Sequence, residues 1–448
     1  MITLQERVHG HPPPDVWQLS KLHHVLKVRK GFKNAGMKEE NLLSLSYGRI
    51  IPKDIDASEG LLPESFEAYQ IVEPGNIVLR LTDLQNDKRS LRQGLVREQG
   101  IVTSAYDALQ VTKGHDPRFW AYALLALDLA KYYYSLGGGV RQSIKFVDFP
   151  NDWLRAPDDE TQKSIADFLD RETARIDHLI EKKQRMLELT KERHHALTER
   201  LVTFGPDSDV ERVETGNLWM PFASKGAQLL PIKRIASLIN GYAFSSDDLG
   251  DKGVPVLRIG DVGTSIDIEA AAKFTGDVPR SLSQFVVQRG DILIAMTGAT
   301  IGKFGVYQSD ELAYINQRVG ILRATRVSSS LLSACLGTRC FVEQMKLFAY
   351  GGAQPNIGAS EIGAIVLPVL PPEIQDVVAK IIDRENARLN FLREQVLNSI
   401  DRLREFRAAL ITAAVTGQID VAAWGKRGRI QKHIDEIEAG PGRKEARA

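Results

Sequence analysis

The chain has 448 residues, of which 43% are hydrophobic and 26% are charged, and its formal net charge at pH 7 is +1. These values are typical of an ordinary globular protein of two or three domains, and they fall short of the basic balance that by itself indicates nucleic-acid binding. No apolar run approaches the roughly 20 residues that span a bilayer, and the N-terminal residues lack a signal-peptide core. We therefore expect a cytoplasmic protein with no membrane contact.

One long helical segment occurs twice in the chain. Glu160–Thr203 aligns with Glu373–Thr416 at a constant shift of 213 positions and without a gap. Within it, for example, Asp170-Arg171-Glu172 falls on Asp383-Arg384-Glu385. An ungapped match of this length indicates a tandem duplication.

The segments upstream of the two helices also match. Trp17–Val25 falls on Leu230–Leu238 at the shift of 213, and Val72–Val78 falls on Val287–Leu293 at a shift of 215. Both pairs are typical of short strands broken by turn residues. Each half also contains one predicted shorter helix, at residues 118–135 and 331–348.

These patterns predict an α/β (α+β) fold in which two globular domains are separated by two long helices. The linker contains Gly205-Pro206, a helix stop signal, and the glycine-rich tail is expected to be a mobile end after a short helix. The expected segments are residues 1–157 (first globular domain), 158–204 (first helix), 205–227 (linker), 228–371 (second globular domain), 372–417 (second helix) and 418–448 (charged tail).

The long helices carry heptad patterns, clear in the second helix and interrupted in the first by Lys183, Thr190 and Arg193. Two helices of about 55 Å, at 1.5 Å per residue, could bury these seams against each other. Antiparallel pairing as a coiled coil would place the globular domains at opposite ends with pseudo-two-fold symmetry. The positions predicted to pack are Ile176, Leu179, Met186 and Leu197 in the first helix and Leu389, Leu392, Val396, Leu403, Phe406 and Leu410 in the second.

A catalytic interpretation finds little support. The segment around Gly298 approaches a phosphate-binding loop, but it has three residues instead of four before Gly302, and Phe304 stands where Ser or Thr would bind magnesium. A glycine turn that brings Thr297 and Lys303 to the surface is the better interpretation. We predict no catalytic residue, no metal site and no cofactor on this chain.

Other conspicuous residues have simple structural interpretations. His194 and His195 are expected to be solvated on the long helix, and Asp158–Glu160 to favour a helix start. Cys335 and Cys340 are expected to be reduced packing residues, and Tyr132–Tyr134 is favoured as core over a base-stacking surface.

Basic, polar and aromatic loop residues in both halves are a better lead, because their donors and acceptors can contact base edges and phosphates. The candidates for DNA contact are Tyr47, Arg49, Arg80, Lys88, Arg89, Arg92 and Arg141 in the first half and Tyr242, Arg258, Thr297, Lys303, Gln317, Arg318 and Gln354 in the second.

Across residues 15 to 421 the chain resembles the specificity subunits of type I restriction-modification systems, the HsdS family. The resemblance is carried by Val287–Leu293, Thr297–Lys303 and Leu367–Gln375, followed by the long helix and Val415–Val421. The first half departs from this pattern: Arg155–Gln162 lacks the double proline of the second half, and Asn76 stands where the second half has Asp291.

The resemblance implies two target recognition domains, each reading one half of a bipartite site in double-stranded DNA. It implies that the helices set the gap and dock two methyltransferase subunits, and it leaves the presence of restriction subunits open. S-adenosylmethionine and ATP would then be cofactors of the partners. The alternative is a coiled-coil scaffold whose globular domains bind protein, with a single-chain enzyme third. Near-neutral charge favours the scaffold, whereas polar-basic loops in both halves favour DNA.

Overall fold

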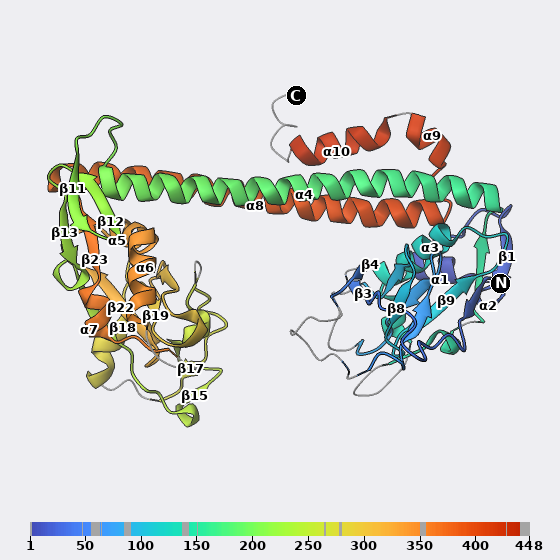
Figure 1. Ribbon diagram of the computed structural model, residues 1–448, viewed down its shortest axis with the longest axis horizontal. Coiled ribbons are helices and arrows are strands. Elements are labelled where there is room, and N and C mark those ends of the chain that lie inside the picture. Colours follow the sequence, from blue (N-terminus) through green and yellow to red (C-terminus); the bar gives the residue numbers. More distant parts are fainter. Residues whose placement is uncertain are drawn as a thin grey trace. The chain divides into compact units, whose positions relative to one another are not determined.

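The computed structural model describes residues 2–46, 48–54, 63, 65–84, 91–136, 143–149, 151–263, 266–276, 280–349, 355–426 and 428–439. The chain divides into two compact units: unit 1 comprises residues 1–184 and 395–448, and unit 2 comprises residues 185–394 (Figure 1). Two long helices, α4 (Asp159–Phe204) and α8 (Pro372–Val415), each contribute one part to each unit. The predicted mixture of helices and strands is confirmed.

Unit 1 combines short strands with a few helices. Its remaining elements are α1 (Leu4–His9), β1 (Gln18–Lys21), α2 (Leu22–Val25), β2 (Leu26–Val28), β3 (Leu43–Ser46), β4 (Arg49–Pro52), β5 (Gln70–Val72), β6 (Ile77–Leu79), β7 (Gln93–Leu95), β8 (Gly100–Val102), β9 (Asp107–Val111), α3 (Pro117–Leu129), η1 (Tyr132–Ser135), η2 (Phe146–Asp148), β10 (Trp153–Ala156), α9 (Val421–Lys426) and α10 (Arg429–Ala439).

Unit 2 has the same character. Its remaining elements are β11 (Arg212–Asn217), β12 (Met220–Ser224), β13 (Gln228–Pro231), η3 (Ile232–Arg234), β14 (Ala236–Asn240), η4 (Ser246–Asp248), β15 (Leu249–Gly250), β16 (Val254–Leu257), η5 (Ile259–Asp261), β17 (Lys273–Phe274), η6 (Arg280–Phe285), β18 (Val286–Val287), β19 (Ile292–Ala295), η7 (Gly298–Thr300), β20 (Phe304–Val306), β21 (Ala313–Ile315), β22 (Val319–Ala324), α5 (Ser329–Leu336), α6 (Arg339–Phe348), α7 (Ala359–Ala364) and β23 (Val366–Val369).

The two units share part of their strand topology. A four-stranded sheet has the order β2-β9-β6-β7 in unit 1 and β14-β22-β19-β20 in unit 2. A two-stranded sheet joins β1 to β10 in unit 1 and β13 to β23 in unit 2. The duplication inferred from the long helices therefore extends through the strand-rich part of each unit.

A glutamine near the start of each long helix makes the same contact in both units. Gln162 Nε2 donates to the Pro157 carbonyl at 2.7 Å, and Gln375 Nε2 donates to the Leu370 carbonyl at 2.8 Å. Each bond satisfies a carbonyl just ahead of a helix. Because both residue pairs differ by 213 positions, the shift found in the sequence also relates the two helix entries.

The shift predicted for the upstream strands is wrong by three positions. Gln18 of β1 pairs with Ala156 of β10, and Gln228 of β13 pairs with Val369 of β23. Since Ala156 and Val369 differ by 213 positions, Gln18 and Gln228 are equivalent, and the shift before β2 and β14 is 210. Apolar residues recur there about every third position, so both shifts place apolar residues on apolar residues.

The turn before β6 and the turn before β19 are built alike, but they differ in charge. The Glu73 amide donates to Asn76 Oδ1 at 2.9 Å, and the Gln288 amide donates to Asp291 Oδ2 at 2.7 Å. In unit 2 the buried Asp291 also accepts two bonds from the Arg323 guanidinium, at 2.8 and 2.7 Å. Unit 2 thus adds an ion pair to a turn that unit 1 builds with a neutral amide.

The shorter helices differ between the units. α3 is continuous and begins at Pro117, where the Asp116 carboxylate caps the first amides. The equivalent region of unit 2 is divided at Gly337 into α5 and α6, capped by Ser328 and Thr338 respectively. The prediction of one equivalent helix in each half is therefore correct for the position of the helices, but in unit 2 the helix is interrupted.

The first part of α4 lies against the last part of α8 in unit 1 (Figure 1). Trp120 bonds to Gln162 near the start of α4 and lies beside Val415 at the end of α8. Further along both helices, Asp177 pairs with Arg407 at 3.0 Å. These contacts require antiparallel helix segments within unit 1.

Burial along the helices follows the predicted seam in α8 but departs from it in α4. Val396, Leu403 and Leu410 are buried in α8, as the heptad pattern predicts. In α4, Met186 is 40% exposed and its neighbour Leu187 is buried at 8%. The other predicted packing residues are buried or half-buried: Ile176, Leu179 and Leu197 in α4, and Leu389, Leu392 and Phe406 in α8.

The prediction for Met186 is wrong because the inward face of α4 follows a different heptad frame. Ile176, Lys183 and Thr190 belong to both frames, and the observed frame continues through Leu187 and Leu201. All five side chains are buried or half-buried. Two polar residues that break the expected apolar pattern therefore belong to the seam itself.

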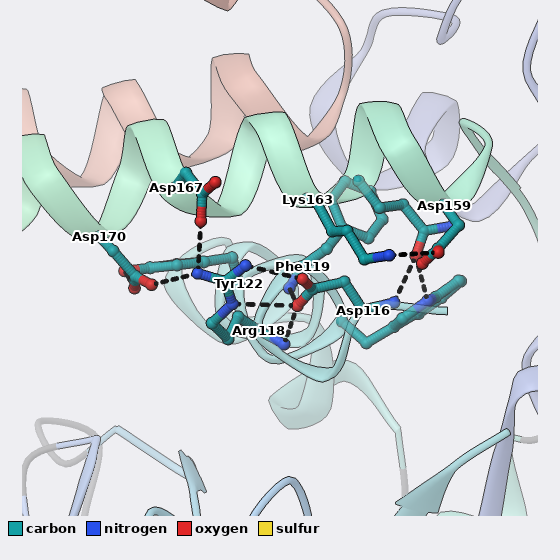
Figure 2. Close-up of polar contacts among 10 residues, drawn as sticks. Asp116, Arg118, Phe119, Tyr122, Asp159, Lys163, Asp167 and Asp170 are labelled. Carbon is teal, nitrogen blue, oxygen red and sulfur yellow. Dashed lines mark hydrogen bonds and ion pairs between the residues drawn. The ribbon is translucent and has the colours of Figure 1, made fainter. Parts of the chain in front are cut away.

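A cluster of ion pairs around Arg118, which we call the Arg118 cluster, connects α3 to α4 in unit 1 (Figure 2). The Arg118 guanidinium contacts the carboxylates of Asp116, Asp167 and Asp170 at 2.8, 2.6 and 3.1 Å. The Tyr122 hydroxyl donates to Asp170 at 2.8 Å. The Arg118 cluster therefore places one cation among three carboxylates from two elements.

The predicted linker and tail are more ordered than expected. Residues 205–227 contain the β11–β12 hairpin, whose Met220 and Ala223 are buried beside Cys340. Residues 418–448 include α9 and α10, and Ile430 and Ile434 of α10 are buried in the unit 1 core. The expectation of a mobile end after one short helix is wrong as far as residue 439.

Other predicted core residues are buried. Tyr132 and Tyr133 lie in the unit 1 core, and both cysteines are buried and free. His195 is not simply solvated, because its Nε2 lies 2.6 Å from the Gly337 carbonyl. In the described part of the chain, no helix is long and apolar enough to cross a membrane, and no cluster of three potential metal-binding side chains occurs.

Candidate nucleic-acid interface

One edge of unit 2 gathers four loops that each follow a strand, and we call this edge the unit 2 rim. The loops belong to strands that are far apart in sequence but neighbouring in the two main sheets. The rim consists of Asn240–Tyr242 after β14, Arg258 after β16, Thr297–Lys303 between β19 and β20, and Asn316–Arg318 between β21 and β22.

Backbone contacts tie these loops together. The Asn316 amide donates to the Leu257 carbonyl at 2.9 Å, directly before Arg258. The Met296 amide donates to the Arg318 carbonyl at 3.0 Å, directly before Thr297. Tyr242 forms an isolated bridge with Asn316. Six of the predicted residues are therefore brought together by the fold: Tyr242, Arg258, Thr297, Lys303, Gln317 and Arg318.

The cations of the rim point outward. Arg258, Lys303, Gln317 and Arg318 are all exposed. Within the described residues, the cations Arg258, Lys303 and Arg318 form no ion pair with a carboxylate. An exposed cation without an internal partner keeps its full charge available to a ligand, and phosphates and guanine edges are ligands of suitable chemistry.

Tyr242 gives the rim an exposed aromatic ring. Its side chain is 44% exposed, and its ring centroid lies 5.0 Å from that of Phe244 and 5.4 Å from that of Phe285. The two phenylalanines fix the ring from the protein side. Its open part has the chemistry to stack on or contact a base.

The Thr297–Lys303 loop is a glycine turn and not a phosphate-binding loop of the nucleotide type. Gly298 and Gly302 have φ values of 68° and 79°, a region that favours glycine. The chain then enters strand β20, whereas a nucleotide-binding loop opens a helix. Lys303 is exposed and Thr297 is half-buried, in accordance with the interpretation from sequence.

The unit 1 candidates do not form a comparable group. Tyr47, Lys88, Arg89 and Arg141, together with Gln354 of unit 2, lie outside the described residues. Arg80 is half-buried directly after β6. Arg49 is exposed, but its guanidinium pairs with Asp177 of α4 at 2.8 Å. An internal partner competes with any phosphate that Arg49 could bind.

Arg92 is not a surface residue, contrary to the expectation. Its side chain is 0% exposed, and its guanidinium bonds to groups inside unit 1. A guanidinium that leaves water needs such partners, because an unpaired buried charge is costly. The sequence shows a basic residue next to a strand, and it does not show that the partners are main-chain carbonyls.

Sequence reasoning overlooked a segment of unit 1 that is equivalent to part of the rim. At the corrected shift of 210, Lys30-Gly31-Phe32-Lys33 corresponds to Asn240-Gly241-Tyr242-Ala243. Phe32 is 48% exposed, much like Tyr242, and both lysines are exposed. The glycine-aromatic pair repeated after β2 and β14 is the signal that could have identified it.

Comparisons with known proteins agree with this architecture. Residues 225–402 match the family described as the type I restriction modification DNA specificity domain. The chain is 24% identical over 434 residues to the type I restriction enzyme MjaVIII specificity subunit of Methanocaldococcus jannaschii, covering 93% of this chain and 96% of that protein. It is 23% identical over 190 residues to the type I restriction enzyme EcoBI specificity subunit of Escherichia coli, covering 41% of this chain and 38% of that protein.

The fold has a solved counterpart. A chain from a study of complex assembly and conformational transition of the type I R-M system aligns with a TM-score of 0.65 at 15% identity, covering 91% of this chain and 100% of that chain. The duplicated fold and the matched domain define a protein of the specificity-domain class. The domain match and the similarity to curated type I specificity subunits support a place in the HsdS family, the specificity subunits of type I restriction-modification systems.

Proposed function

We propose that this chain is a non-catalytic subunit that selects a bipartite site in double-stranded DNA, with one unit reading each half. The observation that carries the proposal is the unit 2 rim, where Arg258, Lys303, Gln317 and Arg318 are exposed at one edge. These side-chain types supply the donors and acceptors that read base edges and the charge that binds phosphates. The near-neutral net charge is compatible with this role because the cations are concentrated locally.

The duplication supports a split site. The units share strand order, but the turn that carries Gln317 and Arg318 in unit 2 carries Ser104 and Ala105 in unit 1. Two units with the same strand order but different loop side chains are suited to binding two different base sequences. We therefore expect the two halves of the site to differ.

The long helices are proposed to set the gap between the half-sites and to dock two methyltransferase subunits as an antiparallel coiled coil. α4 has 46 residues, so at 1.5 Å per residue it is about 69 Å long. In this proposal adenine methylation belongs to the partners, which carry S-adenosylmethionine, and any restriction subunits carry ATP. The complex would act in the cytoplasm.

The proposal is tested by mapping adenine methylation across the genome of a methylation-free host. The cognate modification subunit is expressed with and without this chain. A split motif with a fixed gap, present only with the chain, is the expected result. A soluble complex that yields no motif would favour the protein-binding scaffold instead.

A matched pair of variants tests the rim itself. Lys303→Ala should weaken DNA binding and reduce the salt dependence of log K by about one unit of slope, because one phosphate contact is lost. Lys225→Ala removes an exposed unit 2 cation next to the β11–β12 hairpin, where it pairs with Glu211 at 2.8 Å, and should leave both quantities unchanged. Equal effects of the two variants would contradict a specific role for the rim.

A further inference from the structure

Arg92 is one of the largest fully buried side chains in the described part of the protein. It lies directly before β7, at the edge of the main sheet of unit 1. Burial removes the guanidinium from water, so its position is determined by the protein groups that replace the water.

Among the described residues, those groups include two main-chain carbonyls and one phenol. Nη1 of Arg92 donates to the Thr82 carbonyl at 3.2 Å, and Nη2 donates to the Asp83 carbonyl at 3.5 Å. Nε donates to the Tyr134 hydroxyl at 3.2 Å. The Arg92 backbone amide donates to the Asp128 carboxylate. One planar guanidinium thus connects the segment after β6 to η1, which follows α3.

The segment that Arg92 holds is equivalent to part of the unit 2 rim. The Ile144 amide donates to the Leu81 carbonyl at 2.9 Å, and the Ile357 amide donates to the Met296 carbonyl at 3.0 Å. These equivalent bonds place Leu81 at the position of Met296. The next residue, Thr82, therefore occupies the position that Thr297 occupies in the rim.

The backbone of this segment is constrained. Asp83 has a φ of 56°, in the left-handed region that residues other than glycine rarely adopt. Such a conformation persists where surrounding contacts determine it. The bonds from Arg92 to the carbonyls of Thr82 and Asp83 supply those contacts on both sides of the residue.

The equivalent residue in unit 2 has the opposite orientation. The Arg80 amide donates to the Arg92 carbonyl at 2.7 Å, and the Ala295 amide donates to the Lys303 carbonyl at 2.8 Å. Arg92 and Lys303 therefore hold the same place beside the sheet, yet Arg92 is buried and Lys303 is exposed. The same backbone position therefore carries a buried clamp in unit 1 and a surface cation in unit 2.

We infer that Arg92 is a positioning residue for the specificity of unit 1: it fixes Thr82 and Asp83 as part of the DNA-reading surface without contacting DNA itself. This inference rests on the proposed function. A planar donor fork that fixes two carbonyls reduces the number of loop conformations, and pre-organisation of this kind sharpens discrimination between ligands.

The test uses the full chain with its cognate modification subunit and genome-wide methylation mapping. Arg92→Met keeps the approximate length of the side chain and removes every donor. The expected result is a relaxed base preference in one half-site, with the methylation preference over single-base variants falling about tenfold. The bases of the other half-site and the gap should not change. Arg92→Lys, which cannot reproduce the fork, should give an intermediate relaxation.

Lys303→Met is the matched control at the equivalent position of unit 2. It should lower methylation overall without relaxing the half-site that Arg92→Met affects. Hydrogen exchange of the free chain provides an independent measurement: Arg92→Met should increase the exchange rate at residues 82–84, and Lys303→Met should not. If Arg92→Met does not fold, Tyr134→Phe removes one acceptor of the clamp and should relax the same half-site to a smaller degree.

Two outcomes separate the inference from the proposed function. A wild-type map without a split motif removes the proposed function and this inference with it. A wild-type split motif that a folded Arg92→Met or Tyr134→Phe chain leaves unchanged overturns only the inference, and identifies Arg92 as a core residue without influence on base selection.

Discussion

Units 1 and 2 place their charged side chains in opposite ways around the same strand order. In unit 1, Arg92 is buried against carbonyls, and Arg118 is surrounded by carboxylates. In unit 2, Arg258, Lys303 and Arg318 face outward without carboxylate partners among the described residues. The two units have the same loop positions at the sheet edge. The role of each charged side chain depends on the carbonyl and carboxylate groups close to it.

The attachment of the long helices differs in the same way. In unit 1 the Arg118 guanidinium and its three carboxylates, with the Tyr122 hydroxyl as an additional donor, reinforce the apolar core that α3 and α4 share. α5 contains no charged residue, and its Leu331 and Leu332 pack in an apolar cluster with Val378 of α8. Ionic contacts are sensitive to salt and pH, and apolar contacts are much less so.

The largest expected effect comes from the turn before β19. Asp291→Ala would leave the Arg323 guanidinium without its buried partner, and we expect a loss of about 3 to 4 kcal/mol in the free energy of unfolding. Asp291→Asn with Arg323→Gln reproduces the Asn76 and Gln110 found at the equivalent positions of unit 1 and should cost clearly less. Urea unfolding measures both. Equal losses would show that the unpaired Arg323 guanidinium and the lost turn bond add nothing to the cost of removing the ion pair, and would contradict this expectation.

A pH-dependent effect of about 2 to 3 kcal/mol is expected from Asp128 in unit 1. Loss of hydration on burial raises the pKa of Asp128 to about 6 from 3.8, although the Arg92 amide donates to one of its carboxylate oxygens. The folded state therefore favours the protonated acid. The stability that this group contributes is fully present below about pH 4 and is lost as pH rises through about 6. Asp128→Asn should flatten this dependence in thermal unfolding between pH 4.5 and 7.5, and an unchanged slope would contradict the assignment.

A smaller effect, about 1 to 2 kcal/mol, is expected for Arg118→Ala, because its side chain is 34% exposed and solvent screens part of the interaction. Three carboxylates would remain close together without a cation. Hydrogen exchange should become faster in α3 and at the start of α4, and about 0.5 M salt should reproduce part of the increase in the wild type. Exchange in α5 serves as the internal control and should not respond.

The smallest effect is expected for the outward cations. Lys303→Ala should change the free energy of unfolding by less than about 0.5 kcal/mol, since Lys303 is exposed and without a carboxylate partner among the described residues. Arg92→Ala at the equivalent place should cost several times more, because it leaves the Thr82 and Asp83 carbonyls without their donor. Similar losses for both would remove the distinction between the two units at this position.

The sequence was sufficient for the repeat and for the mixed fold, because the helix periodicity and the 213-residue shift are local, countable patterns. It was insufficient where two patterns fit equally well. Apolar residues about three positions apart hid the true shift of 210 before β2, and a one-residue change of heptad frame placed Met186 outside and Leu187 inside.

The candidate site was predictable only in part for a different reason. A glycine turn or an exposed loop has a sequence signature, so Thr297, Lys303 and Tyr242 could be singled out. The fate of Arg92 depends on carbonyls about ten positions upstream and a phenol 42 positions downstream. Main-chain acceptors carry no residue-type signal, and so no composition or spacing distinguishes a clamp from a surface cation.

In unit 1 the end of α8 meets the beginning of the chain. Gly417 has a φ of 73°, and a Cβ atom there would overlap Pro14 and crowd Trp17. In unit 2 the chain runs directly from the end of α4 through residues 205–227 into β13. The linker thus joins the first repeat directly to the second, and within unit 1 the segment after α8 lies beside the segment before β1. A short peptide from residue 417 to residue 14, with new ends opened between residues 205 and 211, would exchange the order of the repeats, and it would remove the core contacts that α1 and α10 make in unit 1.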